Sequence, residues 1–131
     1  MLHNKIKGSN FERSIVNYLY DKGFEAVRVA GSGGGTIKDR PDILAGNRLN
    51  IYAIEVKTSL KKVIYIKKQQ IKELINFSIG FGATPLVCVN FMKNKDIFFL
   101  KVCNLDKTRD MYKISYNKAL KLQKENKAVA L

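Results

Sequence analysis

Hydrophobic residues at helical spacing predict two well-defined helices and a weaker third. In residues 9–22 an apolar face is flanked by polar positions, Ser9 begins a sequence of N-terminal capping-box form, and Gly23 is suited to end the helix. A second segment of helical periodicity spans residues 67–81. The basic C-terminal part has a weaker pattern, which predicts a last helix at Tyr116–Lys124.

Shorter apolar stretches, bounded by glycine, proline or charged residues, predict the strands. Two of these stretches, ILA and IYAIEV, are expected to form a hairpin that turns near Gly46-Asn47. The glycine-rich segment 31–39 before them reads as a loop. Further strands are expected at residues 24–30, 61–66, 84–92 and 96–103.

The order of these elements predicts the fold class. We expect an α/β (α+β) domain with one central mixed β-sheet of about five strands flanked by helices. The hairpin strands cannot be parallel, which disfavours a purely parallel nucleotide-binding sheet. No interdomain linker is visible, so residues 1–131 are expected to form one domain, with a core at about 7–91 and a C-terminal strand and basic helical tail at 92–131.

The charge of the chain indicates a polyanionic partner. Twenty-four Lys and Arg against 11 Asp and Glu give a net charge of +13. Such a field concentrates polyanions, of which nucleic acid is the commonest. A lysine-rich genome composition explains the same excess without a function, because most of the basic residues are lysine. The chain has neither a long apolar run nor an apolar N-terminal signal, so we expect a cytoplasmic, nucleoid-associated protein with no membrane partner.

Histidine and cysteine residues offer little chemistry. The one histidine, His3, is near the N-terminus, which excludes histidine metal sites and catalytic triads. Cys88 and Cys103 belong to apolar runs without CxxC spacing, so we expect reduced core cysteines rather than a disulfide or zinc site. No GxxxxGK motif is present, and we expect no nucleotide cofactor.

Three charged residues interrupt the predicted hairpin. Alternate side chains of a strand share a face, so Glu55 and Lys57 are expected on the same side of the second strand. If the hairpin closes about Arg48-Leu49, Asp42 lies across from Glu55. Two facing carboxylates repel each other and shift each other's pKa unless a cation lies between them.

A hard divalent ion such as Mg²⁺ suits such a pair. It is typically held by one or two carboxylates together with substrate phosphate and water. Lys57, on the same face, is then placed to orient a water molecule or to stabilise charge on phosphate oxygens. The alternative is a solvated edge strand, in which Asp42 caps a turn after Pro41 and Glu55 has no metal to bind.

The same residues resemble a known family. Pro41-Asp42 and Glu55-Val56-Lys57 match the core motif of the PD-(D/E)xK nucleases. In the wider set KGSNFERSIVNYLYDKGFEAVRVAGSG, PDI, AIEVK, Tyr65 and LINFSIGFG, the chain resembles the archaeal Holliday-junction resolvases over roughly residues 7–91. The loop of this chain, extended between Gly33 and Arg40, departs from the family pattern.

The resemblance implies roles for individual residues. It implies an endodeoxyribonuclease that resolves four-way junctions with paired incisions, leaves 5′-phosphates and uses Mg²⁺, for which Mn²⁺ can substitute. Asp42 and Glu55 are the expected metal ligands, with Glu12 as a possible third. The catalytic residues that it implies are Glu12, Asp42, Glu55 and Lys57, with Ser32 of the loop, and the DNA-binding residues are Arg13, Arg28, Ser32, Lys38 and Arg40.

Two of these residues have simpler interpretations. Glu12 fits the last position of the capping box that begins at Ser9, and it also borders the apolar face of its helix. An arginine in the middle of a strand, such as Arg28, often serves only as the partner of a structural ion pair.

The helix at 67–81 carries more apolar surface than one packing face needs. Its apolar residues span an arc of roughly 200°, against the stripe of about 100° typical of a helix on a core. Phe77 and Phe81, one turn apart, are expected at a homodimer interface, which suits a two-fold symmetric junction. Alternatively, the C-terminal segment covers this helix.

Two other functions fit the same sequence. A restriction- or repair-type nuclease with the same core acts on duplex or flap DNA. A basic DNA-binding module with an inert carboxylate cluster cuts nothing. Junction recognition is expected to rest on shape and backbone contacts, because no base-reading element is evident.

Overall fold

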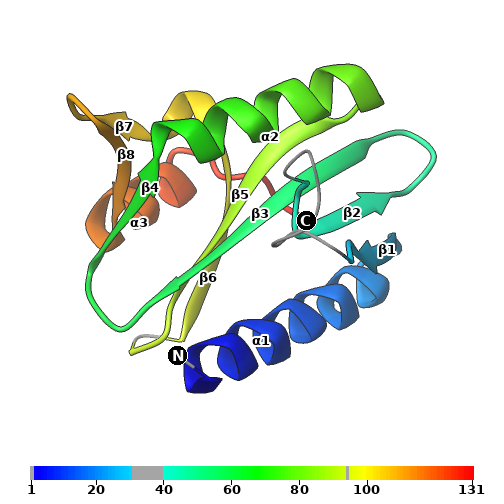
Figure 1. Ribbon diagram of the computed structural model, residues 1–131, viewed down its shortest axis with the longest axis horizontal. Coiled ribbons are helices and arrows are strands. Elements are labelled where there is room, and N and C mark those ends of the chain that lie inside the picture. The colour runs from blue at the N-terminus through cyan, green and yellow to red at the C-terminus, as the bar shows by residue number, and fades with distance from the viewer. Residues whose placement is uncertain (1, 31–39, 94) are drawn as a thin grey trace.

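The structure is a computed structural model that describes residues 2–30, 40–93 and 95–131. The strands lie between α1 and α2 in a layered arrangement (Figure 1). The elements are α1 (Leu2–Asp21), β1 (Glu25–Arg28), β2 (Ile43–Gly46), β3 (Ile51–Ser59), β4 (Val63–Lys67), α2 (Lys68–Phe81), β5 (Thr84–Phe91), β6 (Asp96–Lys101), the 3₁₀ turn η1 (Val102–Asn104), β7 (Asp106–Lys107), β8 (Met111–Ser115) and α3 (Tyr116–Lys124).

Five strands form a central mixed sheet, as the sequence predicts. Their order is β1-β2-β3-β5-β6. β3 and β5 run parallel, connected through β4 and α2, and all other neighbours are antiparallel. The hairpin turn is confirmed, because Asn47 Oδ1 accepts hydrogen bonds from the backbone N–H groups of Leu49 and Asn50 at 3.2 and 2.9 Å. The expected fold class is therefore correct.

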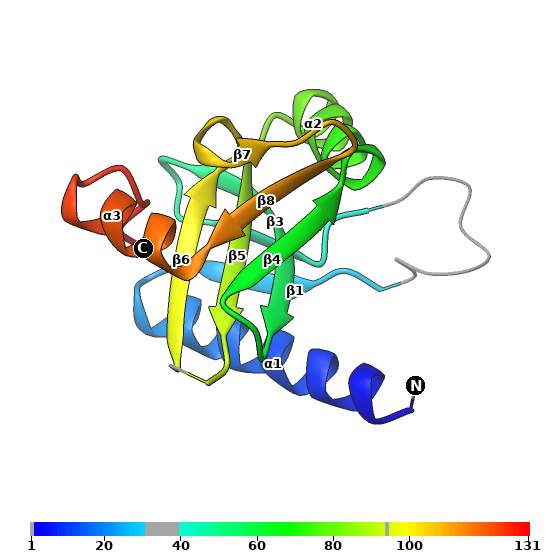
Figure 2. The same cartoon turned by 90° about the vertical axis from the view of Figure 1, so that its left-hand side faces the viewer.

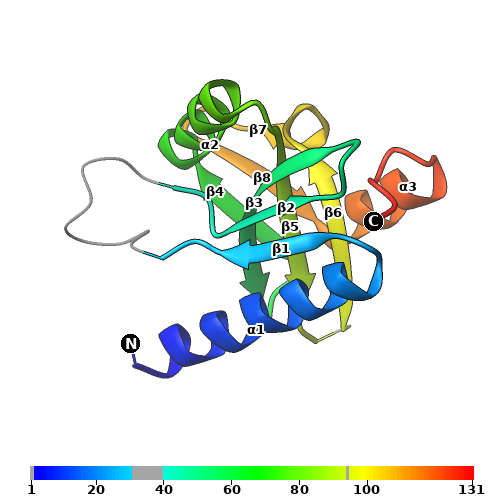
Figure 3. The ribbon, with the colours of Figure 1, turned by 90° about the vertical axis from the view of Figure 1, so that its right-hand side faces the viewer.

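Two hydrophobic cores lie on opposite faces of this sheet. Alternation along β5 separates them, since Leu86 and Cys88 pack with α1 whereas Val87 and Val89 pack with α2. Figure 3 shows α1 on one side of the sheet and α2 on the other. The two-residue period of a strand likewise divides the apolar side chains of β3, since Ala53 belongs to the α2-side core whereas Ile54 belongs to the α1-side core.

A second, smaller sheet was not predicted from the sequence. β4 does not join the central sheet but pairs with β8, which pairs with β7, in an antiparallel sheet of three strands (Figure 2). β7 has only two residues, and β8 carries Lys113 between its apolar residues, so neither has the pattern of a buried strand. This sheet and α3 contribute Ile64, Ile114 and Leu122 to the α2-side core.

The capping box expected at Ser9 is wrong. α1 begins at Leu2, so Ser9 lies inside the helix. The local cause is that no proline interrupts residues 2–8, and a single glycine costs a helix only about 1 kcal/mol. The predicted end of this helix at Gly23 is confirmed. Gly23 has φ +91°, and Phe24 N–H donates to Leu19 O at 2.9 Å in a Schellman-type cap.

Two further observations bear on the predictions. Cys88 is buried as expected, but Cys103 is exposed, because it lies in η1 rather than in a strand. Within the described residues, no helix is both long and apolar enough to span a membrane.

Candidate active site

Asp42 and Glu55 meet across the β2–β3 hairpin. The last paired residues of the two strands are Ile43 and Ile54, and continuing this register by one position places Asp42 opposite Glu55. Asp42 is held by β3 at two points: its N–H donates to Ile54 O at 3.0 Å, and its Oδ2 accepts the N–H of Val56 at 2.8 Å. The register predicted from the sequence is confirmed.

Burial and the proximity of Asp42 perturb the carboxyl group of Glu55. Burial, followed by the hydrogen bond and charge of Asp42, raises the pKa of Glu55 to about 9, against the opposing charge of Lys57. β3 is the third of five strands, so Glu55 is not on an edge, and the alternative of a solvated edge strand is wrong. A half-buried carboxylate pair of this kind favours either a shared proton or a bound cation.

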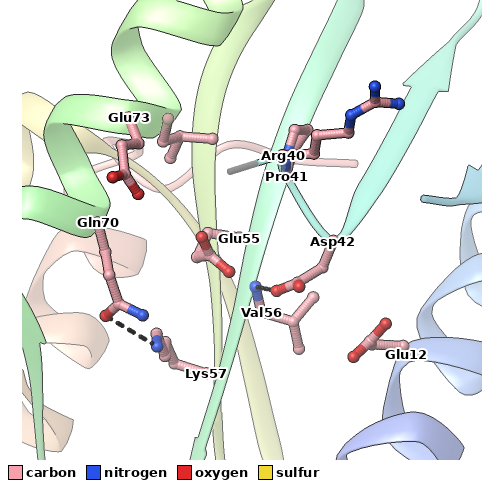
Figure 4. Close-up of a pocket in the computed structure, with 10 residues that line it drawn as sticks. Glu12, Arg40, Pro41, Asp42, Glu55, Val56, Lys57, Gln70 and Glu73 are labelled. Carbon is pink, nitrogen blue, oxygen red and sulfur yellow. Dashed lines mark hydrogen bonds between the residues drawn. The ribbon is translucent and has the colours of Figure 1, made fainter. Parts of the chain in front are cut away.

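Lys57 lies two positions beyond Glu55, on the same face of β3. Its Nζ donates a hydrogen bond of 3.2 Å to Oε1 of Gln70, in the first turn of α2 (Figure 4). The Lys57 side chain is partly buried, and the hydrogen bond to the amide oxygen of Gln70 holds its ammonium group in position. Sequence reasoning missed Gln70, because its role depends on α2 packing over β3.

Glu12 reaches the same site from α1 on the other side (Figure 4). Burial, followed by the charge of Asp42, raises the pKa of Glu12, while Arg28 lowers it. Arg28 Nε donates to Glu12 Oε1 at 3.4 Å. The ion pair that the sequence suggested for Arg28 is thus present, and its partner is a residue of the candidate site.

These side chains line one cavity of about 290 Å³ between α1, the β2–β3 hairpin and α2. Figure 4 shows Glu55 at its centre, with Asp42 and Glu12 to one side and Lys57, Gln70 and Glu73 to the other. The lining residues are Glu12, Arg40, Pro41, Asp42, Glu55, Val56, Lys57, Gln70, Glu73 and Leu74. Glu73 was also missed from the sequence; the one signal was a polar pair three residues apart, Gln70 and Glu73, beside apolar positions of a helix.

Comparisons with known proteins identify the family of this chain. The family model described as archaeal Holliday junction resolvase (Hjc) matches residues 3–130. The chain belongs to this resolvase family. The match extends beyond residues 7–91, where the sequence resemblance was recognised, and includes most of the C-terminal segment.

Individual relatives give the same assignment. The crossover junction endodeoxyribonuclease Hjc of Archaeoglobus fulgidus is 39% identical over 110 residues, covering 84% of this chain and 79% of the relative. The Hjc of Methanocaldococcus jannaschii is 38% identical over 100 residues, covering 76% and 69%. The solved structure of A. fulgidus Hjc, a Holliday junction resolvase from an archaeal hyperthermophile, superposes on this chain with a TM-score of 0.79 at 35% identity. The superposition covers 85% of this chain and 89% of the other.

The oxygen ligands present suit a hard divalent cation of the kind that the resolvase resemblance implies. In the described ranges no group of three acidic, cysteine or histidine side chains is arranged to enclose a metal ion alone. Asp42 and Glu55, however, provide two carboxylates on one cavity, and Mg²⁺ commonly takes one or two, with phosphate and water completing its shell. The pair therefore fits an ion that binds together with substrate.

The basic residues expected to bind DNA are only partly assembled here. Arg40 lines the cavity, and Arg28 is linked to it through Glu12. Arg13 is exposed on α1 and its Nη1 donates to Asn10 Oδ1 at 3.5 Å. Ser32 and Lys38 lie outside the described residues.

The two aromatic residues of α2 stack on each other away from the cavity. The ring centroids of Phe77 and Phe81 are 5.4 Å apart, and Phe77 also packs on the α2-side core. Phe81 is 52% exposed and neighbouring Ile79 is 75% exposed. The C-terminal segment does not cover them, because Val129 N–H bonds to Phe99 O on the α1 side. That alternative is wrong.

Proposed function

We propose that this chain is a structure-selective endodeoxyribonuclease that resolves four-way DNA junctions by paired hydrolytic incisions of opposing strands. The observation that carries the proposal is the facing pair Asp42 and Glu55, with Lys57 on the same face and one cavity around all three. Membership of the resolvase family supports the junction as substrate. Residues 1–131 act as a single nuclease domain in the cytoplasm, at the nucleoid.

Asp42 and Glu55 hold the metal ion in this proposal, with Glu12 as an additional ligand. The ion is Mg²⁺, and Mn²⁺ substitutes for it. When bound, such an ion lowers the pKa of a coordinated water molecule and neutralises charge on the phosphate. The hydrogen bond from Val56 N–H keeps one Asp42 oxygen oriented at the cavity, and Arg28 lowers the pKa of Glu12.

Lys57 acts on the attacking water or on a phosphate oxygen. Its ammonium group is held by Gln70 on the Glu55 side of the cavity, where the reacting phosphate would lie. A positive charge fixed in a partly buried site stabilises developing negative charge more than one in free solvent does. Attack on phosphorus with loss of the 3′-oxygen leaves a 5′-phosphate and a 3′-hydroxyl end.

Arginine side chains around the cavity bind the DNA backbone in the proposal. Arg40 lies at the cavity itself, while Arg13 and Arg28 lie on the α1 side. From the sequence resemblance we also assign DNA contacts to Ser32 and Lys38, and a catalytic contribution to Ser32. Contacts of this kind position the substrate without reading its sequence.

A homodimer formed through α2 provides the second incision. Phe81 and Ile79 expose apolar surface, and Phe77 stacks beneath Phe81. A two-fold interface pairs this patch with its own copy and yields two cavities related by symmetry. A four-way junction has matching two-fold symmetry, so two strands are cut symmetrically.

The deciding experiment is cleavage of a mobile four-way junction beside a linear duplex of the same sequence, with and without Mg²⁺. We expect Mg²⁺-dependent cuts at symmetric positions in the junction and little cutting of the duplex. Equal rates on both substrates would favour the restriction- or repair-type nuclease. Binding without any cleavage in Mg²⁺ or Mn²⁺ would favour the non-catalytic DNA-binding module.

A further inference from the structure

The three-stranded sheet is anchored beside the active-site cavity. β4 ends at Lys67, which is also the N-cap of α2, and the first turn of α2 carries Gln70 of the cavity. A second connection joins the same end of the sheet to α2, since Lys68 Nζ donates to the carbonyl oxygen of Arg109, in the turn between β7 and β8, at 2.7 Å. A ligand that contacts this end of the sheet is therefore placed beside the cavity.

The outer face of the three-stranded sheet is basic and carries an exposed tyrosine. Ile64 and Ile66 of β4 are buried, so the residues that alternate with them point outward. Tyr65 is 56% exposed and lies opposite Lys113 of β8, and Lys67 is exposed one step further along. Lys61 and Lys62 are exposed in the turn that leads into β4.

These lysines have no acidic partner within the described part of the chain. None of Lys61, Lys62, Lys67 and Lys113 takes part in an ion pair. Asp106 pairs in register with Lys113, but its carboxylate forms an ion pair with Lys118 at 3.5 Å instead. The Tyr65 hydroxyl likewise has no hydrogen-bond partner among the described residues. Several adjacent donors without partners are suited to a ligand that supplies anionic oxygens at regular spacing.

We propose that this basic sheet face, formed by Lys61, Lys62, Tyr65, Lys67 and Lys113, binds the phosphate backbone of a duplex arm of the DNA substrate. The inference rests on the proposed function, because an arm reaches the face when its scissile phosphate occupies the cavity. The groups that this face exposes are lysine ammonium groups and a tyrosine hydroxyl, which donate to phosphate oxygens, so the contacts are made to the backbone. The second sheet thereby acquires a role in holding the substrate.

The test measures binding as a function of salt concentration in two matched charge variants. Lys67→Gln with Lys113→Gln removes two charges from the basic sheet face. The control, Lys22→Gln with Lys124→Gln, removes two charges at the ends of α1 and α3. The probes are four-way junctions with long arms and junctions with arms truncated to a few base pairs. Ca²⁺ replaces Mg²⁺ in these measurements, so that binding is followed without cleavage in wild type and in both variants.

Each phosphate contact contributes about 0.9 to the slope of log affinity against log salt. We expect the sheet-face variant to lose about 1.8 from this slope on long-armed junctions and about tenfold or more in affinity at low salt, and to lose less on truncated arms. The control variant keeps the wild-type slope. Tyr65→Phe, which removes only the hydroxyl group, weakens binding and leaves the slope unchanged.

Three results would overturn the proposal: an unchanged slope in the sheet-face variant, an equal loss in the control, or dissociation of the dimer by the sheet-face substitutions, which would assign the face to a second copy of the chain. Failure of the proposed function is recognised separately. If wild-type protein binds junctions but cuts none with Mg²⁺, the proposed nuclease function is wrong. The difference in salt slope between wild type and the sheet-face variant still reports whether the basic sheet face binds DNA.

Discussion

Asp42 and Glu55 face each other one position beyond the last ladder pair of β2 and β3, and Asp42 is held there by the N–H of Val56. Their positions are thus set by backbone pairing rather than by flexible side-chain contacts. Two carboxylates so placed repel unless a proton or a cation separates them.

Replacing Glu55 by Gln should abolish cleavage while binding persists. The change keeps the shape of the side chain but removes a charged metal ligand, and the metal contributes several kcal/mol to charge stabilisation. Because about 1.4 kcal/mol is a factor of ten in rate, we expect the single-turnover rate on a junction to fall by about 10³-fold or more. Glu25→Gln, at an exposed position of β1, is the control. Cleavage that survives in Glu55→Gln contradicts the metal site.

The stability of the metal-free protein should fall as pH rises. Glu55 has a folded-state pKa of about 9 against 4.5 for the free side chain, so the folded state holds a proton that the unfolded state releases. Stability is therefore greatest below about pH 4.5 and is lost towards pH 9, by at most about 1.4 kcal/mol per pH unit. Chemical denaturation in EDTA across this range measures it.

The matched variant for this measurement is Glu55→Gln, which has no proton to lose and should show a flatter profile. Added Mg²⁺ should raise the melting temperature more at high pH than at low pH, because metal binding requires the deprotonated carboxylate. If the free energy of unfolding of wild type and of Glu55→Gln depends on pH in the same way, Glu55 does not have the raised pKa that its surroundings imply.

Replacing Gln70 by Leu should slow cleavage without weakening junction binding. The hydrogen bond that holds Lys57 Nζ is lost, and an apolar side chain is placed in the cavity. We expect a loss of about 10-fold to 100-fold in single-turnover rate, because Lys57 is still present but is misplaced by the loss of its partner. Gln123→Leu, exposed on α3, serves as control. A wild-type rate in Gln70→Leu shows that Lys57 does not depend on this contact.

Replacing Phe81 by Ala should weaken the dimer more than it weakens the fold. Phe81 is 52% exposed in the single chain, whereas Phe77 also packs on the core. Phe77→Ala should therefore weaken the dimer and also lower the stability of the fold. Sedimentation at micromolar concentration measures the mass, and Tyr20→Ala, an exposed aromatic of α1, is the control. If Phe77→Ala and Phe81→Ala both keep the mass of the dimer, the dimer interface does not include these residues.

Local patterns predicted the parts of the molecule that local physics determines. The two-residue period of Ile51–Lys57, with a hairpin closed about Arg48-Leu49, was enough to place Glu55 opposite Asp42. The capping box at Ser9 misled because a cap signal shows where a helix can begin, not whether residues before it continue the helix. Gln70 and Cys103 could not be placed, because their surroundings are built by elements far along the chain or by a 3₁₀ turn without a periodic pattern.

Most of the described residues that line the cavity belong to one continuous stretch of chain. This stretch runs through the hairpin, β4 and the start of α2, and contributes Asp42, Glu55, Lys57, Gln70 and Glu73. Among the described lining residues, Glu12 alone comes from an element distant in the sequence. Sites closed by nearby residues require little loop-closure entropy. A chain folding in stages can therefore assemble the carboxylate pair and its lysine early, and the docking of α1 would then be the step that completes the centre.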